Sequence, residues 1–444
     1  MVRVTRPWTA LTRPLRDTTL RTALRGGSWA LVGTFVGRVA HVGALLLAAR
    51  HLGSEQFGGM SLALSTMLVV TSVSALGLPV AAQKLVAEAR EIDVIRRDRL
   101  IDITLGMTAF VGLLTMIGGA LSSAWVADVI LDRPDVAPLV AVASIFILTT
   151  PMVEILAGLL AALERFGAVG LFRAVHGSLC GVLVIVLLST SGAMAVLWVL
   201  AAADALACVL GLRLVTSARG PRSTARYGRT DLLIEVRSLL RVSLPALIAS
   251  VSLQPALWLG QVLLSRQPDG LGHVGTFAVA MRWHAIALFV PATMGSVLLP
   301  MLGRLRATGR SMDARVVFVR YGALTLAFST AACLGLIAFA APLMGLQGAE
   351  YSLASGVLVV LAVATVPAAL NNVLSQRALA EGRLALWVWS DLALSTTLAA
   401  SAFALIPPLD GIGLASAYLA AYVATCLVLL PIALAAPSPA GGQV

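Results

Sequence analysis

Long apolar stretches recur along the whole sequence, and several carry no charged residue, such as Phe57–Gln83 and Ile103–Ala127. About 20 apolar residues are enough for one helix to cross a bilayer. Such a chain has to bury these stretches in lipid, so we predict an all-α integral membrane protein with twelve transmembrane helices. The stretches lie at about 26–49, 57–82, 103–126, 136–163, 167–189, 193–212, 242–264, 274–300, 321–344, 351–375, 384–406 and 411–434.

The composition argues against a water-soluble protein. Hydrophobic residues make up 59% of the 444 residues and charged residues only 12%, against roughly 45–50% and about 25% in an ordinary soluble domain. The sequence contains neither a GxxxxGK[ST] nucleotide-binding loop nor a large outer loop that would house a glycosyltransferase or polymerase site. The four cysteines form no CxxC pair. We therefore expect no enzyme, cofactor, metal or nucleic-acid partner.

Basic residues gather in alternate connections, which is the pattern that fixes topology in membrane proteins. With both termini in the cytoplasm, the cytoplasmic segments hold 27 of the 32 Lys and Arg residues, and the outer loops hold only Arg50, Arg133 and Arg266. Arginine outnumbers lysine 31 to 1, which suggests a GC-rich bacterial genome. We predict a multi-pass protein of the bacterial inner (plasma) membrane, with both termini cytoplasmic and with arginines that contact membrane lipids.

A weak internal repeat, offset by about 216 residues, divides the chain into two halves. Pro151 and Pro367 fall in register, and Phe57–Leu64 resembles Val274–Met281. Two six-helix halves that start on the same side give a parallel pseudo-twofold repeat, and transporters of this kind place their substrate site at the repeat interface. We predict a basic cytoplasmic N-terminal tail at 1–25, an N-lobe at 26–215, a cytoplasmic basic linker at 216–240, a C-lobe at 241–435 and a short C-terminal tail at 436–444.

Two arginines lie within predicted membrane helices, where a charge costs roughly 2.5–3.5 kcal/mol even on the lenient insertion scale. Arg38 is in the first stretch, with His41 on the same helix face, and Arg282 is in the eighth. A guanidinium offers a fixed fork of donors that matches phosphate oxygens. We predict that Arg38, Arg282, His41 and Gln254, which matches Arg38 in the repeat, bind a pyrophosphate. The alternative for Arg38 is a structural pair with an acid such as Glu154.

Other polar residues lie inside the predicted helices. The acids Glu154, Asp204 and Asp391 are candidates for ion coupling, because intramembrane carboxylates relay protons or bind Na⁺. Their alternative role is to neutralise Arg38, Arg173 or a neighbouring helix. Asn371 and Asn372 form a polar patch that suits either saccharide hydroxyls or helix–helix hydrogen bonds.

Three segments resemble a known family. The first is His51-Leu-Gly-Ser-Glu-Gln-Phe-Gly, followed by an uncharged helix that ends Ala75-Leu-Gly-Leu-Pro. The others are Leu160-Ala-Ala-Leu-Glu-Arg-Phe and Val274-Gly-Thr-Phe-Ala-Val-Ala-Met-Arg. They are similar to polysaccharide and lipid-linked oligosaccharide flippases of the multidrug/oligosaccharidyl-lipid/polysaccharide exporter superfamily. The sequence departs from that pattern around Trp258, where the family often has an acidic residue and this chain has none, so no coupling role is transferred to that position.

The resemblance implies two six-helix lobes that form a V around a central cavity and rock in alternating access. It implies a flippase that carries a polyprenyl-diphosphate-linked saccharide from the inner to the outer leaflet for surface polysaccharide assembly. Glycosyltransferases or a polymerase of the same pathway would be further partners. A cation-coupled multidrug antiporter of the same fold stays open as the alternative, as do a twelve-helix facilitator of another class and a scaffold for a polysaccharide synthase.

Overall fold

The computed structural model describes residues 18–90, 92–187, 192–219, 229–251, 253–307 and 311–434, and within these ranges the chain is helical without strands. Nine of the described helices are long and apolar enough to cross a membrane. Two of the nine span 46 and 47 residues, more than twice the ~20 that one crossing needs. The expected all-α, multi-pass class is confirmed, and the count of twelve crossings stays a prediction. The predicted tails lie mostly or wholly outside the described residues.

Each of the two longest helices is bent by one residue in the left-handed backbone region. In α2 (Thr18–Ser74) this residue is Gly53, with a φ of 76°, and in α17 (Leu384–Leu434) it is Asp410, with a φ of 47°. Left-handed φ values interrupt a regular α-helix, and glycine and aspartate tolerate them best. Both kinks lie between two predicted stretches, so each of these elements consists of two helices joined at a kink, in line with the two crossings that the sequence predicts there.

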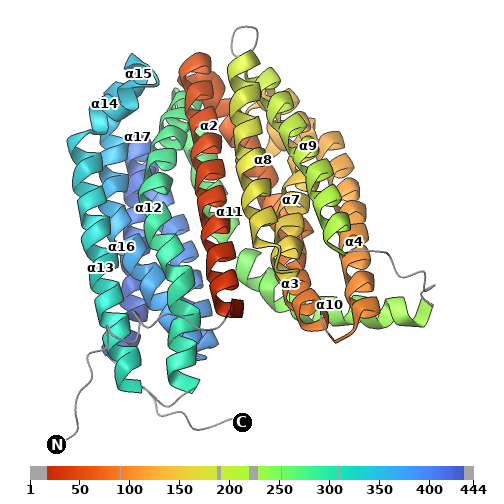
Figure 1. The fold of residues 1–444 in the computed structure, drawn as a ribbon. Helices are drawn as coiled ribbons and strands as arrows, with labels where there is room; N and C mark the ends of the chain where they lie inside the picture. Colours follow the sequence, from red (N-terminus) through yellow and green to blue (C-terminus); the bar gives the residue numbers. More distant parts are fainter. Residues whose placement is uncertain are drawn as a thin grey trace, which may run out of the picture.

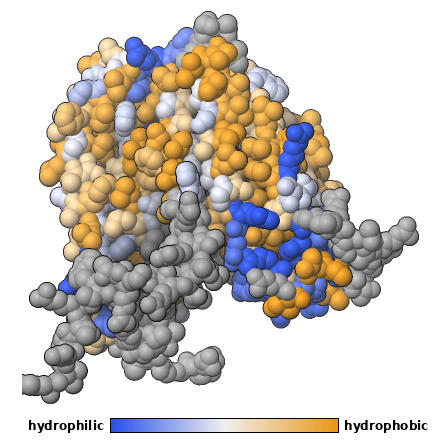
Figure 2. All heavy atoms as spheres, in the orientation of Figure 1, coloured by the Kyte–Doolittle hydropathy of each residue, from blue (hydrophilic) through white to orange (hydrophobic). Residues whose placement is uncertain are grey.

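The remaining helices lie on two sides of α2 (Figure 1). On one side are α3 (Leu78–Ala89), α4 (Val94–Leu121), α6 (Ala137–Ala143), α7 (Ile145–Ala162), α8 (Phe166–Leu187) and α9 (Ala193–Arg219). On the other are α12 (Gly270–Ala307), α13 (Ser311–Ala338), α14 (Ala340–Gly345), α15 (Ala349–Leu353), α16 (Ser355–Ala380) and α17. We call α2–α9 the N-terminal half and α11–α17 the C-terminal half. Figure 2 shows that most of the visible face between the two ends of the molecule is hydrophobic, as a lipid-facing surface requires.

The seventh predicted stretch, 242–264, is divided between α10 (Arg229–Val251) and α11 (Leu253–Ser265). Helix α10 lies across the ends of α3 and α4 (Figure 1). Arg96 on α4 fastens it through an ion pair of 3.0 Å to the buried Glu235, while Leu233 and Ile234 stay exposed. This combination of a charged and an apolar face suits a helix that lies in the membrane interface. The first part of α10 belongs to the predicted linker, whose middle lies outside the described residues.

Helices α2 and α8 approach each other unusually closely, and glycines make this possible. A Cβ atom at Gly37 would lie 2.0 Å from the carbonyl oxygen of Arg173, and one at Gly177 would lie 1.9 Å from that of Gly37. Gly33 and Gly170 face each other in the same way. Small residues let membrane helices pack backbone against backbone. The close approach brings the polar residues of α2 next to those of α8.

Replacing Gly37 with leucine should therefore separate α2 from α8 and destabilise the protein. We expect a loss of at least 1–3 kcal/mol, the usual cost of overpacking a well-packed contact, and a lower melting temperature of the purified protein in detergent. Gly43→Leu is the matched control, because a Cβ at Gly43 meets no atom within 4 Å. Equal melting temperatures for the two variants would contradict this account of the packing.

Candidate substrate-binding site

Two arginines face each other where α2 meets α12. Arg38 on α2 and Arg282 on α12 lie close enough to repel each other electrostatically. Arg38 is exposed and Arg282 partly buried, and Nε of Arg282 is a buried atom without a hydrogen-bond partner. Within the described part of the chain, neither guanidinium forms an ion pair with an acid. Two intramembrane cations without acidic partners are an arrangement that favours an anionic ligand.

His41 lies beside this pair, one helical turn after Arg38. It is within electrostatic range of Arg38, Arg282 and Asp204, and its ring centroid is 6.3 Å from that of His176. Its Nδ1 atom is buried and has no hydrogen-bond partner. The structure therefore brings together three of the four residues that the sequence assigns to pyrophosphate binding.

The acids near this place are already paired. Glu154 on α7 accepts two hydrogen bonds of 2.7 Å from the two terminal nitrogens of Arg173. Asp204 on α9 lies 2.7 Å from Nε2 of His176, and its other oxygen accepts a hydrogen bond of 3.0 Å from Thr149. The structure thus gives Glu154 and Asp204 the charge-pairing arrangement that the sequence analysis held as the alternative to ion coupling. Glu154 also lies within electrostatic range of Arg38, but its ion pair is with Arg173, so the described residues provide no direct ion pair for Arg38 or Arg282.

Donor atoms of three kinds meet at the Asp204 carboxylate. Ligand atoms of His176, Cys180 and Asp204 lie within 4.8 Å of one another, a donor set that zinc accepts. The same carboxylate oxygens, however, already take part in the contacts with His176 and Thr149. We therefore assign Asp204 to this hydrogen-bonded pair.

The other residues predicted from the sequence form no hydrogen bond or ion pair with the arginines among the described residues. Gln254 is partly buried on α11. Asn371 accepts a hydrogen bond of 3.4 Å from Ser375, and Oδ1 of Asn372 is buried without a partner. Asp391 is partly buried on α17, and within the described residues no side chain pairs with its carboxylate.

The polar face of α8, with Arg173 and His176, and the hydroxyl of Thr149 were not predicted as parts of this site. Arg173 and His176 are three residues apart and therefore share one helix face, and that face turns toward α7 and α9. The spacing of the two cations was the available signal. Their partners could not be read from the sequence, because α7 and α9 could meet α8 in several registers. Thr149 had no signal, since a threonine inside an apolar helix usually bonds only its own backbone.

The two halves are joined firmly at the end where the kink of α2 and the short helix α15 lie (Figure 1). Glu350 on α15 accepts hydrogen bonds of 2.8 Å from both the backbone N–H and the hydroxyl of Ser54. The hydroxyl of Tyr351 donates to the carbonyl of Ala49 at 3.1 Å. We call this end the sealed end.

Reciprocal contacts strengthen the sealed end. The Arg133 guanidinium donates to the carbonyl of Ser265 at 2.7 Å, and Arg266 donates to the carbonyl of Ile130 at 2.7 Å. Arg133 and Arg266 are among the few arginines that the charge pattern places outside. Deeper along α2, Nε1 of Trp258 donates to the hydroxyl of Thr66 at 3.0 Å. The predicted outer end is therefore the one at which the two halves are hydrogen-bonded together.

A family model described as "Polysaccharide biosynthesis protein" matches residues 23–306, well over half of the chain. The chain belongs to this family. Among curated proteins, it is 27% identical over 241 residues to the "EPS I polysaccharide export inner membrane protein EpsE" of Ralstonia nicotianae, covering 53% of this chain and 52% of that protein. The protein of the same name from Ralstonia solanacearum is 28% identical over 226 residues, 49% and 48% of the two chains. The family member described here thus aligns with about half the length of these relatives.

Solved structures share the fold over most of the chain. A multidrug resistance MATE family transporter of the MOP superfamily in an inward-facing conformation has a TM-score of 0.76 at 14% identity, covering 90% of this chain and 96% of that one. The lipid II flippase MurJ in an inward closed conformation has a TM-score of 0.71 at 14% identity, covering 90% and 86%. This family member therefore shares the all-α fold of these transporters, and the expected polysaccharide family is confirmed by the family model.

Repulsion between the two arginines should be measurable as a loss of stability in the empty protein. We expect Arg282→Gln to raise the melting temperature of the purified protein, corresponding to about 1 kcal/mol, because binding residues are often held at the expense of stability. Arg173→Gln should act in the opposite direction, since it leaves the Glu154 carboxylate without its partner. Thermal unfolding of both variants in the same anion-poor detergent buffer tests this. Destabilisation by Arg282→Gln would show that Arg282 is a structural residue.

Proposed function

We propose that this protein is a flippase that moves a polyprenyl-diphosphate-linked saccharide from the inner to the outer leaflet for surface polysaccharide assembly. The observation that carries the proposal is the pair formed by Arg38 and Arg282. The two guanidinium groups come from opposite halves of the molecule, repel each other and have no acidic partner among the described residues. A ligand that places negative charge between them would remove the repulsion.

A pyrophosphate has the right chemistry for this place. Each arginine can donate two parallel hydrogen bonds to phosphate oxygens, and the guanidinium stays charged at any physiological pH. Two phosphates in one linkage allow one arginine to hold each. The site would thereby replace the water that the pyrophosphate loses on entering the membrane, while the lipid tail stays in the bilayer.

The comparisons support this class of substrate. The relatives named above are polysaccharide export proteins, and MurJ is named a lipid II flippase. A cation-coupled multidrug antiporter of the same fold is the alternative. Two uncompensated arginines would repel a cationic drug, so the flippase is the better proposal.

Alternating access would use the sealed end as its outer gate. If the seal around Glu350 opens while the opposite end closes, the ligand between Arg38 and Arg282 is exposed to the other side. The membrane potential, negative inside, favours outward movement of an anion by about 2.3 kcal/mol per charge per 100 mV. Of the three candidate coupling acids, Asp391 is the one without a side-chain partner in the described part of the chain, and we keep it as the candidate for ion coupling. Inner-membrane placement with cytoplasmic termini and pathway enzymes as partners belong to the same proposal.

Loss of the arginine pair should abolish export without unfolding the protein. In a deletion strain complemented with Arg38→Gln/Arg282→Gln, we expect polyprenyl-linked saccharide to accumulate and surface polymer to fall at least tenfold. Extraction of lipid-linked saccharides together with a surface-glycan assay measures both. Arg213→Gln is the control, because Arg213 is an exposed residue on α9 outside the arginine pair.

The two outcomes that contradict the proposal differ in meaning. Normal export by the double variant would refute the role of the arginines. Unchanged glycans in the deletion strain, together with new sensitivity to cationic dyes, would favour the antiporter.

Weakening the seal should expose its interior to the outer solution. Glu350→Ala removes both hydrogen bonds to Ser54. In a background without native cysteines, a cysteine at position 66, which is buried in the wild type, should then react several-fold faster with a membrane-impermeant thiol reagent added outside. Glu55→Ala is the control, because Glu55 lies next to Ser54 on α2 and forms no ion pair within the described residues. An equal reaction rate in both variants would refute the gate.

A further inference from the structure

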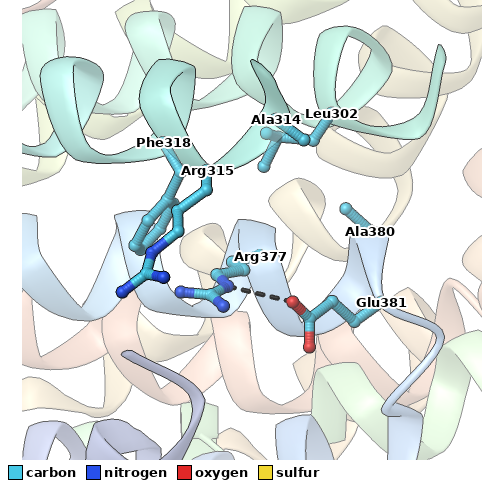
Figure 3. A pocket seen from close by; sticks show the side chains of 7 residues that line it. All are labelled: Leu302, Ala314, Arg315, Phe318, Arg377, Ala380 and Glu381. Carbon is cyan, nitrogen blue, oxygen red and sulfur yellow. Dashed lines mark hydrogen bonds and ion pairs between the residues drawn. The ribbon is translucent and has the colours of Figure 1, made fainter. Parts of the chain in front are cut away.

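A hollow with basic residues lies in the C-terminal half, between the ends of α12, α13 and α16 (Figure 3). It is shallow and separate from the arginine pair. Leu302, Ala314 and Ala380 form apolar walls, and the remaining lining residues are Arg315, Phe318, Arg377 and Glu381. The charge pattern places this end of the helices on the cytoplasmic side.

Two of the cations at the hollow are held in place by neighbours. The guanidinium carbon of Arg377 lies 4.6 Å from the ring centroid of Phe318, and its Nε is 2.9 Å from Oε1 of Glu381. The other oxygen of Glu381 lies 3.4 Å from Nε of Arg383. One carboxylate therefore serves two arginines, which leaves the group with net positive charge.

Arg315 lines the same hollow but takes no part in this network of ion pairs. Its side chain is exposed, and within the described residues it forms no hydrogen bond or ion pair. Figure 3 shows the guanidinium groups of Arg315 and Arg377 pointing into the same space. The two cations converge on one hollow, and the only carboxylate among its lining residues, that of Glu381, is already shared between Arg377 and Arg383. Such an arrangement suits an anion.

The rim of the hollow faces lipid. Met312, Val316 and Val319 lie on α13 around Arg315 and are 67%, 41% and 57% exposed. Exposed apolar side chains on a membrane-spanning helix contact acyl chains. An anion that enters here therefore comes with an apolar portion beside it, which distinguishes a lipid headgroup from a free ion.

We propose that this hollow binds the phosphate headgroup of an anionic phospholipid from the inner leaflet, with Arg315 and Arg377 as its cations. Basic pockets between transmembrane helices on the cytoplasmic side are suited to such headgroups. The bound lipid would bridge α13 and α16 and stabilise their packing. This site is independent of the transported substrate and holds whether or not the flippase proposal does.

The test uses the full-length protein, delipidated in detergent, with phosphatidylglycerol or phosphatidylcholine added. A lipid that binds the folded state raises the melting temperature by mass action. We expect a saturable rise with phosphatidylglycerol and little with phosphatidylcholine. Arg315→Gln should weaken the apparent affinity for phosphatidylglycerol about fivefold, from the usual contribution of one basic residue near a lipid surface. Arg320→Gln, on the same helix but outside the hollow, should match the wild type.

Native mass spectrometry of the same samples counts the lipids that remain bound. Equal phosphatidylglycerol retention by Arg315→Gln and Arg320→Gln would overturn the proposal. Displacement of the lipid by millimolar inorganic phosphate would also overturn it, in favour of a site for a free anion. Because none of these measurements involves transport, a failure here leaves the arginine pair of the flippase untouched.

Discussion

Inside the bilayer no water satisfies polar groups, and this constraint governs the whole molecule. Every backbone group must find its partner within a helix, so the described chain is helical from end to end. Side chains obey the same rule. Glu154 is hydrogen-bonded to Arg173, and Asp204 is hydrogen-bonded to His176 and Thr149. Other buried polar atoms also lack a hydrogen-bond partner, such as Oδ1 of Asn372, but Arg38 and Arg282 are charged groups inside membrane helices for which the described residues provide no ion pair.

The position of those arginines follows from how closely the helices approach. Glycines at Gly37 and Gly177 let α2 lie backbone to backbone against α8. This contact places the ring of His41 near that of His176, while Arg38 lies on the side of α2 that meets α12. A wider spacing would place lipid or bulky side chains between these groups. The packing of one helix pair thus determines the electrostatics at the interface between the two halves.

The sequence was sufficient for the fold class, because that signal needs no partner to be known, while the binding role of the arginine pair stays a prediction. Apolar length predicts a crossing, and a charge within it predicts a site. Pairings depend on register between helices, so the sequence analysis offered Glu154 as a partner of either Arg38 or Arg173, and only the structure shows the latter.

The arginine pair also suggests how such a transporter would avoid changing conformation without a bound substrate. In the proposed mechanism, Arg38 and Arg282 belong to halves that must change their relative position during transport. Their repulsion opposes any arrangement that brings them closer, and a bound pyrophosphate turns that repulsion into attraction for a common ligand. Closure around the site is then favoured when substrate is present and opposed when it is absent. This argument needs only two charges on two halves, neither of which forms an ion pair with an acid among the described residues.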